Sequence, residues 1–330
     1  MRIAVDAFGG DNAPLEIIKG ARAAATEYDV EIALVGMEDE IRKCAEENGV
    51  SLDGMTVVDA PDVLTMHDEP TAILRALKNS SMAVAFRLVA DGEADAFVSA
   101  GSTGAVVVGG TLIIKRIKGI KRVALGSMIP GVNKSYLMMD IGANSDTRPE
   151  MLAQYGLMAS VYLEEVEGIK NPEIGLLNIG TEDTKGDELR LAAYSMLQNA
   201  PINFIGNVES REIPKGICDG VITDGFTGNI ALKLIEGVTL SFFKLLKGVF
   251  YKNIVTKLAA LTMKSGLGEV KKKADYSEVG GAPLLGCAKP VIKAHGSSNA
   301  KAIKNAIHQA IIYTENNVVD KISAGLEKMQ

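Results

Sequence analysis

A loop of small residues that could bind an anion runs from Ser99 to Gly104 and reads Ser-Ala-Gly-Ser-Thr-Gly. An apolar run precedes it and another follows it, which is typical of a strand, a tight loop and the start of a helix. The first N–H groups of a helix have no partner within the helix and lie at its positive end. The backbone of Gly101 and Gly104 and the hydroxyls of Ser102 and Thr103 could therefore hold a phosphate. Most loops of this kind only turn the chain, so this loop alone does not establish a site.

Polar clusters rich in glycine follow four other strand-like runs. Their main members are Asp6, Gly10 and Asp11; Asp140, Gly142 and Asn144; Asn178, Gly180, Lys185 and Gly186; and Asp224, Gly228 and Asn229. In open parallel sheets, ligands bind at the carboxyl ends of the strands. We therefore expect all five clusters to meet at one edge of the sheet as a single site. The alternative is that they are turn residues and helix caps, although this alternative does not require Lys185.

The elements that would position these clusters alternate between strand and helix along the chain. Strands are expected at 3–6, 31–35, 55–59, 95–99, 136–140, 174–179, 202–205 and 221–223. Helices are expected at 15–27, 38–48, 71–90, 105–115, 149–164, 188–198 and 302–318. This alternation predicts a three-layer α/β/α fold with a mainly parallel sheet between two layers of helices.

Composition excludes several classes of protein. The 330 residues are 47% hydrophobic, which is enough for a large core, and the net charge is −6. This charge and an aromatic content of only 5% argue against a nucleic-acid partner. The three cysteines form no Cys-x-x-Cys pair and the three histidines have no metal-ligand spacing, so we expect no metal. Asp6 interrupts any apolar leader, and we expect a cytoplasmic protein.

Two segments raise the question of a membrane. Residues 96–114 carry no charge over nearly the length of a spanning helix, but the central Ser-Ala-Gly-Ser-Thr-Gly loop breaks any such helix. Residues 240–268 instead have apolar residues at helical spacing and only lysines as charged residues, namely Lys244, Lys247, Lys252, Lys257 and Lys264. This pattern is typical of a helix that lies on a membrane surface.

The anchor would use Ile254, Leu258 and Leu261. An equally weighted alternative for residues 240–250 is a helix in the core or in a dimer interface, because apolar residues nearly surround its axis. We therefore expect the exposed part of the segment to be 254–267.

The ordered set of motifs resembles the PlsX family of phosphate acyltransferases over nearly the whole chain. The blocks that carry the resemblance are Asp6-Ala-Phe-Gly-Gly-Asp-Asn-Ala-Pro14, Met66-His-Asp-Glu-Pro70, Lys78-Asn-Ser-Ser-Met82, Ser99-Ala-Gly-Ser-Thr-Gly-Ala105, Asp140-Ile-Gly-Ala-Asn144, Asn178-Ile-Gly180, Lys185-Gly186, Asp224-Gly-Phe-Thr-Gly-Asn229, Gly280-Gly-Ala282 and His295-Gly-Ser-Ser298. Many members of the family have Met in place of Phe8 and Asn in place of Ser102.

The resemblance implies a single catalytic unit over residues 1–330, with a protruding amphipathic helical segment at about 240–275 and a fold like that of isopropylmalate dehydrogenases and phosphotransacetylases. It implies transfer of a fatty acyl chain from acyl–acyl carrier protein to inorganic phosphate, without a cofactor. The acyl phosphate formed would start phospholipid synthesis. It also implies a homodimer, and a membrane glycerol-3-phosphate acyltransferase that uses the product is a candidate partner. Peripheral association with the membrane, which the segment 240–268 predicts, agrees with this partner.

This reaction suits the polar residues in the clusters. Phosphate is itself a nucleophile, so the enzyme must position it and stabilise the oxyanion that forms at the thioester. Lys185 could balance the phosphate charge, Asn229 could donate to the oxyanion, and His295 could relay a proton. The remaining expected binding residues are Asp6, Gly10, Asp11, Ser99, Gly101, Ser102, Thr103, Gly104, Asp140, Asn144, Asp224, Gly228 and Ser297.

Each of these roles has a structural alternative, and the function has others as well. Lys185 could be a solvated loop residue, Asn229 could cap its helix, and His295 could belong to an ordinary turn. A phosphotransacetylase that uses acyl coenzyme A is the nearest rival enzyme. A dehydrogenase of the same fold lacks support, because the chain has no Gly-x-Gly-x-x-Gly motif. A membrane-surface scaffold without catalysis is the third alternative.

Overall fold

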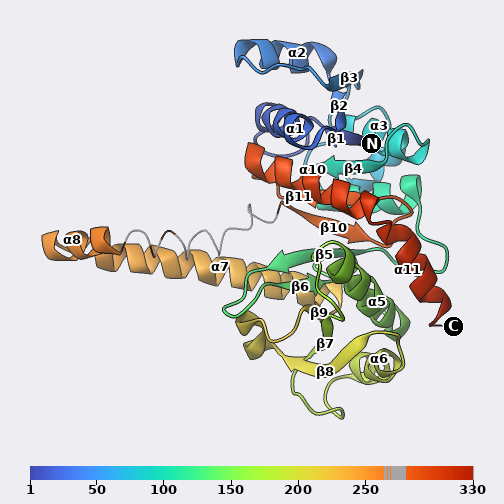
Figure 1. The fold of residues 1–330 in the computed structure, drawn as a ribbon, viewed down its shortest axis with the longest axis vertical. Coiled ribbons are helices and arrows are strands. Elements are labelled where there is room, and N and C mark those ends of the chain that lie inside the picture. Colours follow the sequence, from blue (N-terminus) through green and yellow to red (C-terminus); the bar gives the residue numbers. More distant parts are fainter. Residues whose placement is uncertain (264–265, 267, 269–279, 330) are drawn as a thin grey trace.

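The computed structural model describes residues 1–263, 266, 268 and 280–329, and within them eleven strands form one sheet (Figure 1). The strands are β1 (Arg2–Asp6), β2 (Glu31–Gly36), β3 (Met55–Asp59), β4 (Ala96–Ser99), β5 (Ala124–Ile129), β6 (Tyr136–Met139), β7 (Glu173–Asn178), β8 (Asn203–Glu209), β9 (Gly220–Ile222), β10 (Gly281–Leu285) and β11 (Val291–Ala294). Their order is β3-β2-β1-β4-β11-β10-β5-β6-β9-β7-β8.

Helices cover both faces of this sheet, so the predicted fold class is confirmed. They are α1 (Leu15–Tyr28), α2 (Glu38–Glu47), α3 (Ser81–Ala90), α4 (Thr103–Gly109), α5 (Pro149–Glu165), α6 (Glu188–Gln198), α7 (Gly225–Phe250), α8 (Ile254–Thr262), α10 (Ala300–Glu315) and α11 (Val318–Glu327). Shorter turns are the 3-10 helices η1 (Pro70–Leu74) and η3 (Ser210–Lys215) and the π-helix η2 (Gly110–Ile114), which continues α4.

The sheet reverses direction near its middle. β3, β2, β1, β4 and β11 are parallel to one another, but β10 is antiparallel to both β11 and β5. β5 is in turn antiparallel to β6, which is parallel to β9, β7 and β8. The carboxyl ends of β1, β4 and β11 therefore lie at one edge of the sheet, and those of β6, β9 and β7 lie at the opposite edge. The expectation that all five clusters end at one edge is wrong.

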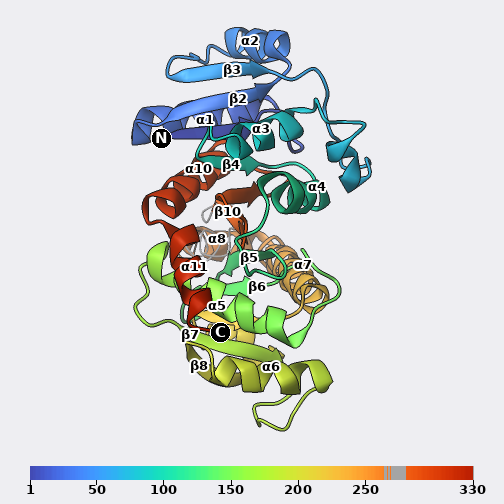
Figure 2. The same ribbon diagram turned by 90° about the vertical axis from the view of Figure 1, so that its right-hand side faces the viewer.

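The core consists of one apolar layer on each face of the sheet. On one face, α1, α5, α6, α10 and α11 contribute buried side chains such as Ile18, Tyr162 and Ile307. On the other face, α3 and α4 contribute Phe86 and Val106, and the Phe86 ring stacks on Phe97 of β4 at 3.7 Å between centroids. Figure 2 shows α4 and α7 on the same side of the molecule.

Helices α7 and α8 form an arm that leaves the body of the protein (Figure 1). Ala231, Leu232 and Ile235 of α7 still pack against the core. Beyond them, Val238 is 59% exposed and Leu245 is 72% exposed, and α8 buries none of its residues. Burial of 240–250 in the core of this chain is therefore wrong. The dimer-interface alternative for this segment stays a prediction, and so does the expectation that exposure begins at residue 254. The expected contributions of Lys264, Leu267 and residues 269–275 lie outside the described residues.

No helix within the described ranges is long and apolar enough to cross a membrane. The uncharged stretch 96–114 is divided among β4, the loop, α4 and η2, as the sequence predicts.

Close packing of α1 on α10 yields a first prediction, because Gly20 of α1 leaves no room for a side chain. A Cβ atom there would lie 2.6 Å from the Ala300 carbonyl oxygen and 2.6 Å from Cβ of Ile303. We expect Gly20→Ala to lower the free energy of unfolding by about 1–3 kcal/mol through overpacking. The matched control is Gly237→Ala in α7, where a Cβ meets nothing within 4 Å and should add about 0.5–1 kcal/mol of helix stability. Denaturant unfolding measures both changes, and equal midpoints for Gly20→Ala and the parent would contradict the packing argument.

Candidate active site

The buried carboxylate of Asp6 joins the loops that follow β1 and β4. One of its oxygens accepts hydrogen bonds from Ser81 Oγ at 2.6 Å and from the backbone N–H of Phe8, and the other accepts from Ser99 Oγ at 2.6 Å. Ser99 Oγ in turn accepts from the N–H of Gly101 at 2.9 Å. Burial raises the pKa of Asp6, and the hydroxyls of Ser81 and Ser99 oppose this rise. Asp6 and Ser99 therefore fix the geometry of the two loops.

The loop that follows β11 is held against the same place. The N–H of Asp11 donates to the Gly296 carbonyl at 2.8 Å, and Asn12 Nδ2 donates to the Ser297 carbonyl at 3.1 Å. Gly10 has φ +98°, and a Cβ there would lie 2.8 Å from the Gly296 carbonyl oxygen, so only glycine fits. Three loops thus meet at the first edge of the sheet.

Lys293 of β11 is a buried cation at this edge that the sequence analysis missed. Its side chain is among the buried polar groups, and Nζ donates to the carbonyls of Ala100, at 3.3 Å, and Ala294. Burial lowers the pKa of Lys293 to about 8, against the attraction of Asp6 and Asp11. The sequence does contain a pattern that indicates this buried cation, because Lys293 lies inside the apolar run Pro-Val-Ile-Lys-Ala. Lysine is almost never fully buried unless it is paired.

His295 and Ser297 lie in the loop that follows β11. The two side chains are 2.8 Å apart between Nδ1 and Oγ, and the Ser297 N–H points at the same nitrogen. Burial, and then the charge of Lys293, lowers the pKa of His295, so the ring is neutral near pH 7. Glu236 and Lys233 of α7 also act on this pKa, which shows that α7 passes close to the first edge.

Ser102, Thr103 and Gly104 stand where the sequence predicts, at the end of β4 and the start of α4. Ser102 is buried at the N-cap position, but its hydroxyl does not bond to the helix. Thr103 and Gly104 are partly exposed, and Gly104 packs against Pro70.

At the opposite edge, Asp140 organises the loop that follows β6. One oxygen accepts from the N–H groups of Gly142 and Ala143 at 3.1 and 2.9 Å, and the other accepts from both the backbone and the side chain of Asn144. Burial raises the pKa of Asp140, and these hydrogen bonds oppose the rise. Asn144 also donates to the Val123 carbonyl at 2.7 Å. Asp140 and Asn144 therefore hold the backbone in place and leave no carboxylate oxygen free of bonds.

Asp224 begins α7 and ties it to α6. Its carboxylate accepts from the N–H and the hydroxyl of Thr227, each at 2.8 Å, and from Arg190 at 2.5 Å. Burial opposes ionisation, but the bonds from Thr227 and the charge of Arg190 outweigh it and lower the pKa of Asp224. Gly228 lets α7 approach β6, because a Cβ there would lie 1.9 Å from the Asp140 carbonyl oxygen.

Asn229, near the start of α7, and Lys185, in the loop that follows β7, are both exposed. Asp224, and not Asn229, caps α7, so the capping alternative for Asn229 is wrong. Asn229 lies beside Gly142, and its amide bonds to no group in the described part of the chain. The Lys185 carbonyl accepts from Asn178 Nδ2 at 3.0 Å, whereas its ammonium forms no ion pair with any described residue. Both side chains are exposed and available to a ligand.

The structure thus brings the predicted residues together as two groups. The first contains Asp6, Gly10, Asp11, Ser99, Gly101, Ser102, Thr103, Gly104, His295 and Ser297. The second contains Asp140, Asn144, Lys185, Asp224, Gly228 and Asn229. Helix α7 connects them, because it starts in the second group and carries Lys233 and Glu236 past His295.

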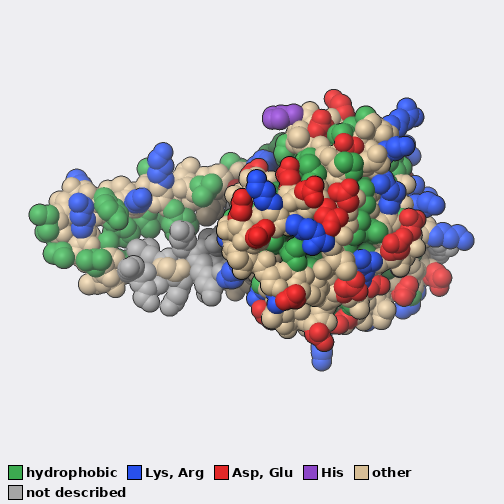
Figure 3. Space-filling view, turned by 90° about the horizontal axis from the view of Figure 1, so that it is seen from above, with side chains coloured by type: hydrophobic (Ala, Val, Ile, Leu, Met, Phe, Trp, Pro, Cys, Tyr) green, Lys and Arg blue, Asp and Glu red, His purple; other side chains and the backbone are tan. Residues whose placement is uncertain are grey.

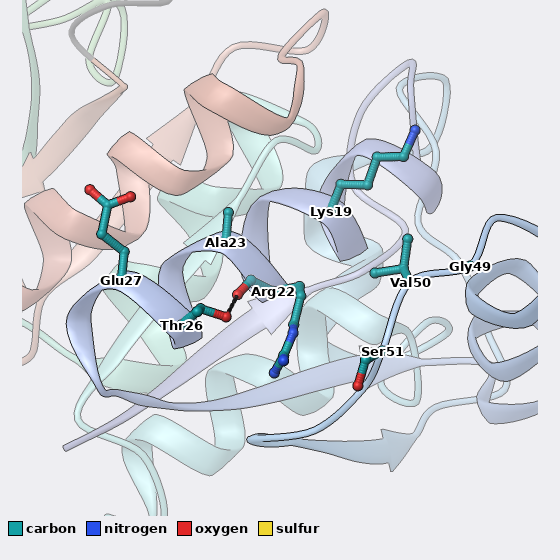
Figure 4. A pocket seen from close by; sticks show the side chains of 8 residues that line it. All are labelled: Lys19, Arg22, Ala23, Thr26, Glu27, Gly49, Val50 and Ser51. Carbon is teal, nitrogen blue, oxygen red and sulfur yellow. Dashed lines mark hydrogen bonds between the residues drawn. The ribbon is translucent and has the colours of Figure 1, made fainter.

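Other features of the described chain do not add a reactive group. Among the described residues no cluster of His, Cys, Asp and Glu could hold a metal. Burial raises the pKa of the Cys218 thiol to about 12 and also raises that of Cys287. A hollow of about 580 Å³ between α1 and residues 49–51 contains none of the predicted site residues (Figure 4). A second hollow, of about 460 Å³, lies on α7 and is lined by Lys233, Leu234, Gly237, Val238, Ser241, Phe242 and Leu245.

Solved structures share this fold. A phosphotransacetylase from Streptococcus pyogenes aligns with a TM-score of 0.65 and 17% identity, over 97% of this chain and 94% of that chain. A 4-hydroxythreonine-4-phosphate dehydrogenase from Klebsiella pneumoniae aligns with a TM-score of 0.55 and 14% identity, over 95% of this chain and 99% of that chain. The fold is therefore the one that the motifs imply.

Sequence comparison is more specific. A family described as fatty acid synthesis protein matches residues 1–321. A phosphate acyltransferase from Oceanobacillus iheyensis is 49% identical over 330 residues, which cover 100% of this chain and 98% of the relative. One from Clostridium acetobutylicum is 46% identical over 330 residues and 100% of both chains. These matches over the whole length show that the chain is an acyltransferase and belongs to the PlsX family of phosphate acyltransferases.

Proposed function

We propose that the protein transfers a fatty acyl chain from acyl–acyl carrier protein to inorganic phosphate and releases an acyl phosphate for phospholipid synthesis. The observation that carries this proposal is a pair of exposed polar groups in ordered surroundings: Asn229, near the start of the helix that Asp224 caps, and Lys185, in a loop that the Asn178 amide holds. An amide donor and a cation are what a phosphate and an oxyanion need, and preorganisation makes them effective.

The proposed reaction takes place beside the first turns of α7, between the two groups. A phosphate oxygen attacks the carbonyl carbon of the thioester while Lys185 balances the phosphate charge. The Asn229 amide donates to the oxyanion of the tetrahedral intermediate. Collapse of this intermediate breaks the C–S bond, and the thiolate takes up the proton that the attacking hydrogen phosphate gives up. Neutral His295 is suited to relay that proton, and Ser102, Thr103 and Gly104 supply further donors to phosphate.

The mechanism requires no covalent acyl-enzyme. Cys218 and Cys287 are buried, and their raised pKa values keep them protonated at neutral pH. A thiol in that state is a poor nucleophile. Direct attack by phosphate therefore agrees with the chemistry of the described chain.

The hollow on α7 offers a path for the acyl chain. It begins at Lys233, which acts on His295, and continues along Leu234, Val238 and Phe242. Apolar walls with a few polar groups at one end are typical of sites for amphipathic ligands.

We further propose a homodimer in which a second copy covers exposed apolar side chains of α7.

We also propose that the arm binds the membrane surface. Figure 3 shows apolar and basic side chains along the arm. Ile254 is 76% exposed, Leu258 60% and Leu261 65%, and α8 contains Lys257 as its charged residue. Each lysine near an anionic leaflet contributes about 1 kcal/mol, which together with apolar insertion gives reversible binding. The position would bring the product to a membrane glycerol-3-phosphate acyltransferase.

The reaction itself gives the first test. Purified protein supplied with acyl–acyl carrier protein and phosphate should form an acyl phosphate that hydroxylamine traps, without added metal or nicotinamide. Acyl coenzyme A in a parallel assay separates the two donors. Activity with acyl coenzyme A alone would replace the proposed donor, and no product from either would reject the function.

The roles of Asn229 and Lys185 give the second test. Asn229→Ala should lower kcat by about a hundredfold or more, because it removes one oxyanion donor. Lys185→Ala should lower turnover and raise the KM for phosphate. Cys218→Ala is the matched control and should keep its activity. Circular dichroism should show that all three variants fold, and parent-like turnover in both site variants would leave these residues without a catalytic role.

The arm gives the third test. Leu258→Glu with Leu261→Glu should weaken co-sedimentation with anionic liposomes, because each change places a carboxylate where an apolar side chain would enter the interface. Leu191→Glu, at an exposed leucine of α6, is the control and should bind as the parent does. Unchanged binding by the double variant, with its oligomeric state preserved, would show that α8 is not the anchor.

A further inference from the structure

A basic loop that the proposed reaction does not use lies between η2 and β5. The sequence contains no Asp or Glu between Asp95 and Asp140, although the chain as a whole has a net charge of −6. Within this stretch, five cations fall in eight residues: Lys115, Arg116, Lys118, Lys121 and Arg122.

The structure presents these cations as a fixed outward surface. The apolar residues interspersed among and flanking them, Ile114, Ile117, Ile120 and Val123, are buried, whereas all five cations are exposed. The backbone is anchored because the Ile117 N–H donates to the Gly286 carbonyl at 2.9 Å. The Lys121 N–H donates to Gln154 at 2.8 Å, and Gln154 donates to the Gly119 carbonyl at 3.0 Å.

None of the five cations forms an ion pair with a carboxylate in the described ranges. Some surface cations elsewhere in the described chain are paired with carboxylates. Lys134 lies 2.6 Å from Asp219, and Lys304 lies 2.6 Å from Glu27. Five adjacent cations without such partners create a local positive potential, which attracts an acidic surface and speeds its association.

The loop adjoins the second group of site residues. Its last cation precedes Val123, whose carbonyl accepts the hydrogen bond from Asn144. At its other end it follows η2, which continues the helix that starts at Thr103. A partner bound here is therefore placed beside the site.

The position also distinguishes between kinds of partner. A Cβ on Gly119 would lie 3.8 Å from Leu326, so the loop packs beside α11. In Figure 1, α11 lies on the side of the body opposite to the arm. A bilayer bound by α8 would lie away from the loop, which favours a soluble acidic partner.

We propose that Lys115, Arg116, Lys118, Lys121 and Arg122 form the docking surface for an acidic face of the acyl carrier protein. This inference rests on the proposed function, which gives the donor as a thioester on that protein. Docking beside Asn144 directs the thioester toward the second group while the carrier stays outside.

The test is the double variant Lys118→Glu with Lys121→Glu, whose side chains make no hydrogen bond to the described chain. Lys43→Glu with Lys170→Glu is the control, because both lysines are exposed and the net charge changes equally. We expect the test variant to raise the KM for acyl–acyl carrier protein about tenfold or more, since steering changes association rates by about 10–10³. Its kcat at saturating carrier, its KM for phosphate and its rate with an uncharged acyl-pantetheine thioester should remain those of the parent, and its dependence on salt should be weaker.

Each other outcome has a separate meaning. If the parent is active and the test variant, the control and the parent have equal KM values for the carrier, the loop is not the docking surface. The proposed reaction would be unaffected by that result. Loss of binding to anionic vesicles without a change in carrier kinetics would assign the loop to lipid and overturn the proposal. A parent that uses only acyl coenzyme A would overturn the proposed donor, and the docking surface with it.

Discussion

The antiparallel pairing of β10 with β11 and β5 determines where every polar loop lies. Through β10 the two parallel halves of the sheet form one structure, although their strands run in opposite directions. The loops after β1, β4 and β11 therefore emerge at one edge, and those after β6, β7 and β9 emerge at the other. A site that uses both sets needs an element that runs from one edge to the other, and α7 is that element.

Two buried carboxylates, one at each edge, hold these loops rigidly. Asp6 accepts two hydroxyls from separate elements, and Asp140 accepts most of the N–H groups of its own loop. Burial alone would favour the protonated acids, so the hydrogen bonds have to offset a substantial desolvation cost. As a result, the backbone beside Asn229 is ordered, whereas the side chain of Asn229 stays exposed. The residues that hold the backbone of the loops, Asp6 and Asp140, are thus different from Asn229, the residue that could contact a substrate.

Local pattern predicted the elements well where helix and strand alternate. The strand-loop-helix reading of Ser99–Gly104 is confirmed, and so is the mainly parallel α/β fold. The periodicity of the sequence did not predict β5, β10 and β11. Their direction in the sheet depends on pairing between residues that lie far apart in the chain, such as Leu285 and Ala124. The error about a single edge follows from those missing strands. Lys293 was overlooked for a related reason, since its burial depends on β4 and on the loop at Ala100.

The length of α7 sets the distance between Asn229 and helix α8. Its 26 residues span roughly 39 Å at the rise of an α-helix. One end carries Asn229, and the other end leads to α8. In the proposed membrane-bound state, with α8 on a bilayer, α7 would hold Asn229 above the lipid headgroups by as much as its own length. The proposed fatty acyl product would then have to cross that gap along a protein surface, and α7 presents exposed apolar side chains there, among them Leu234, Val238 and Phe242.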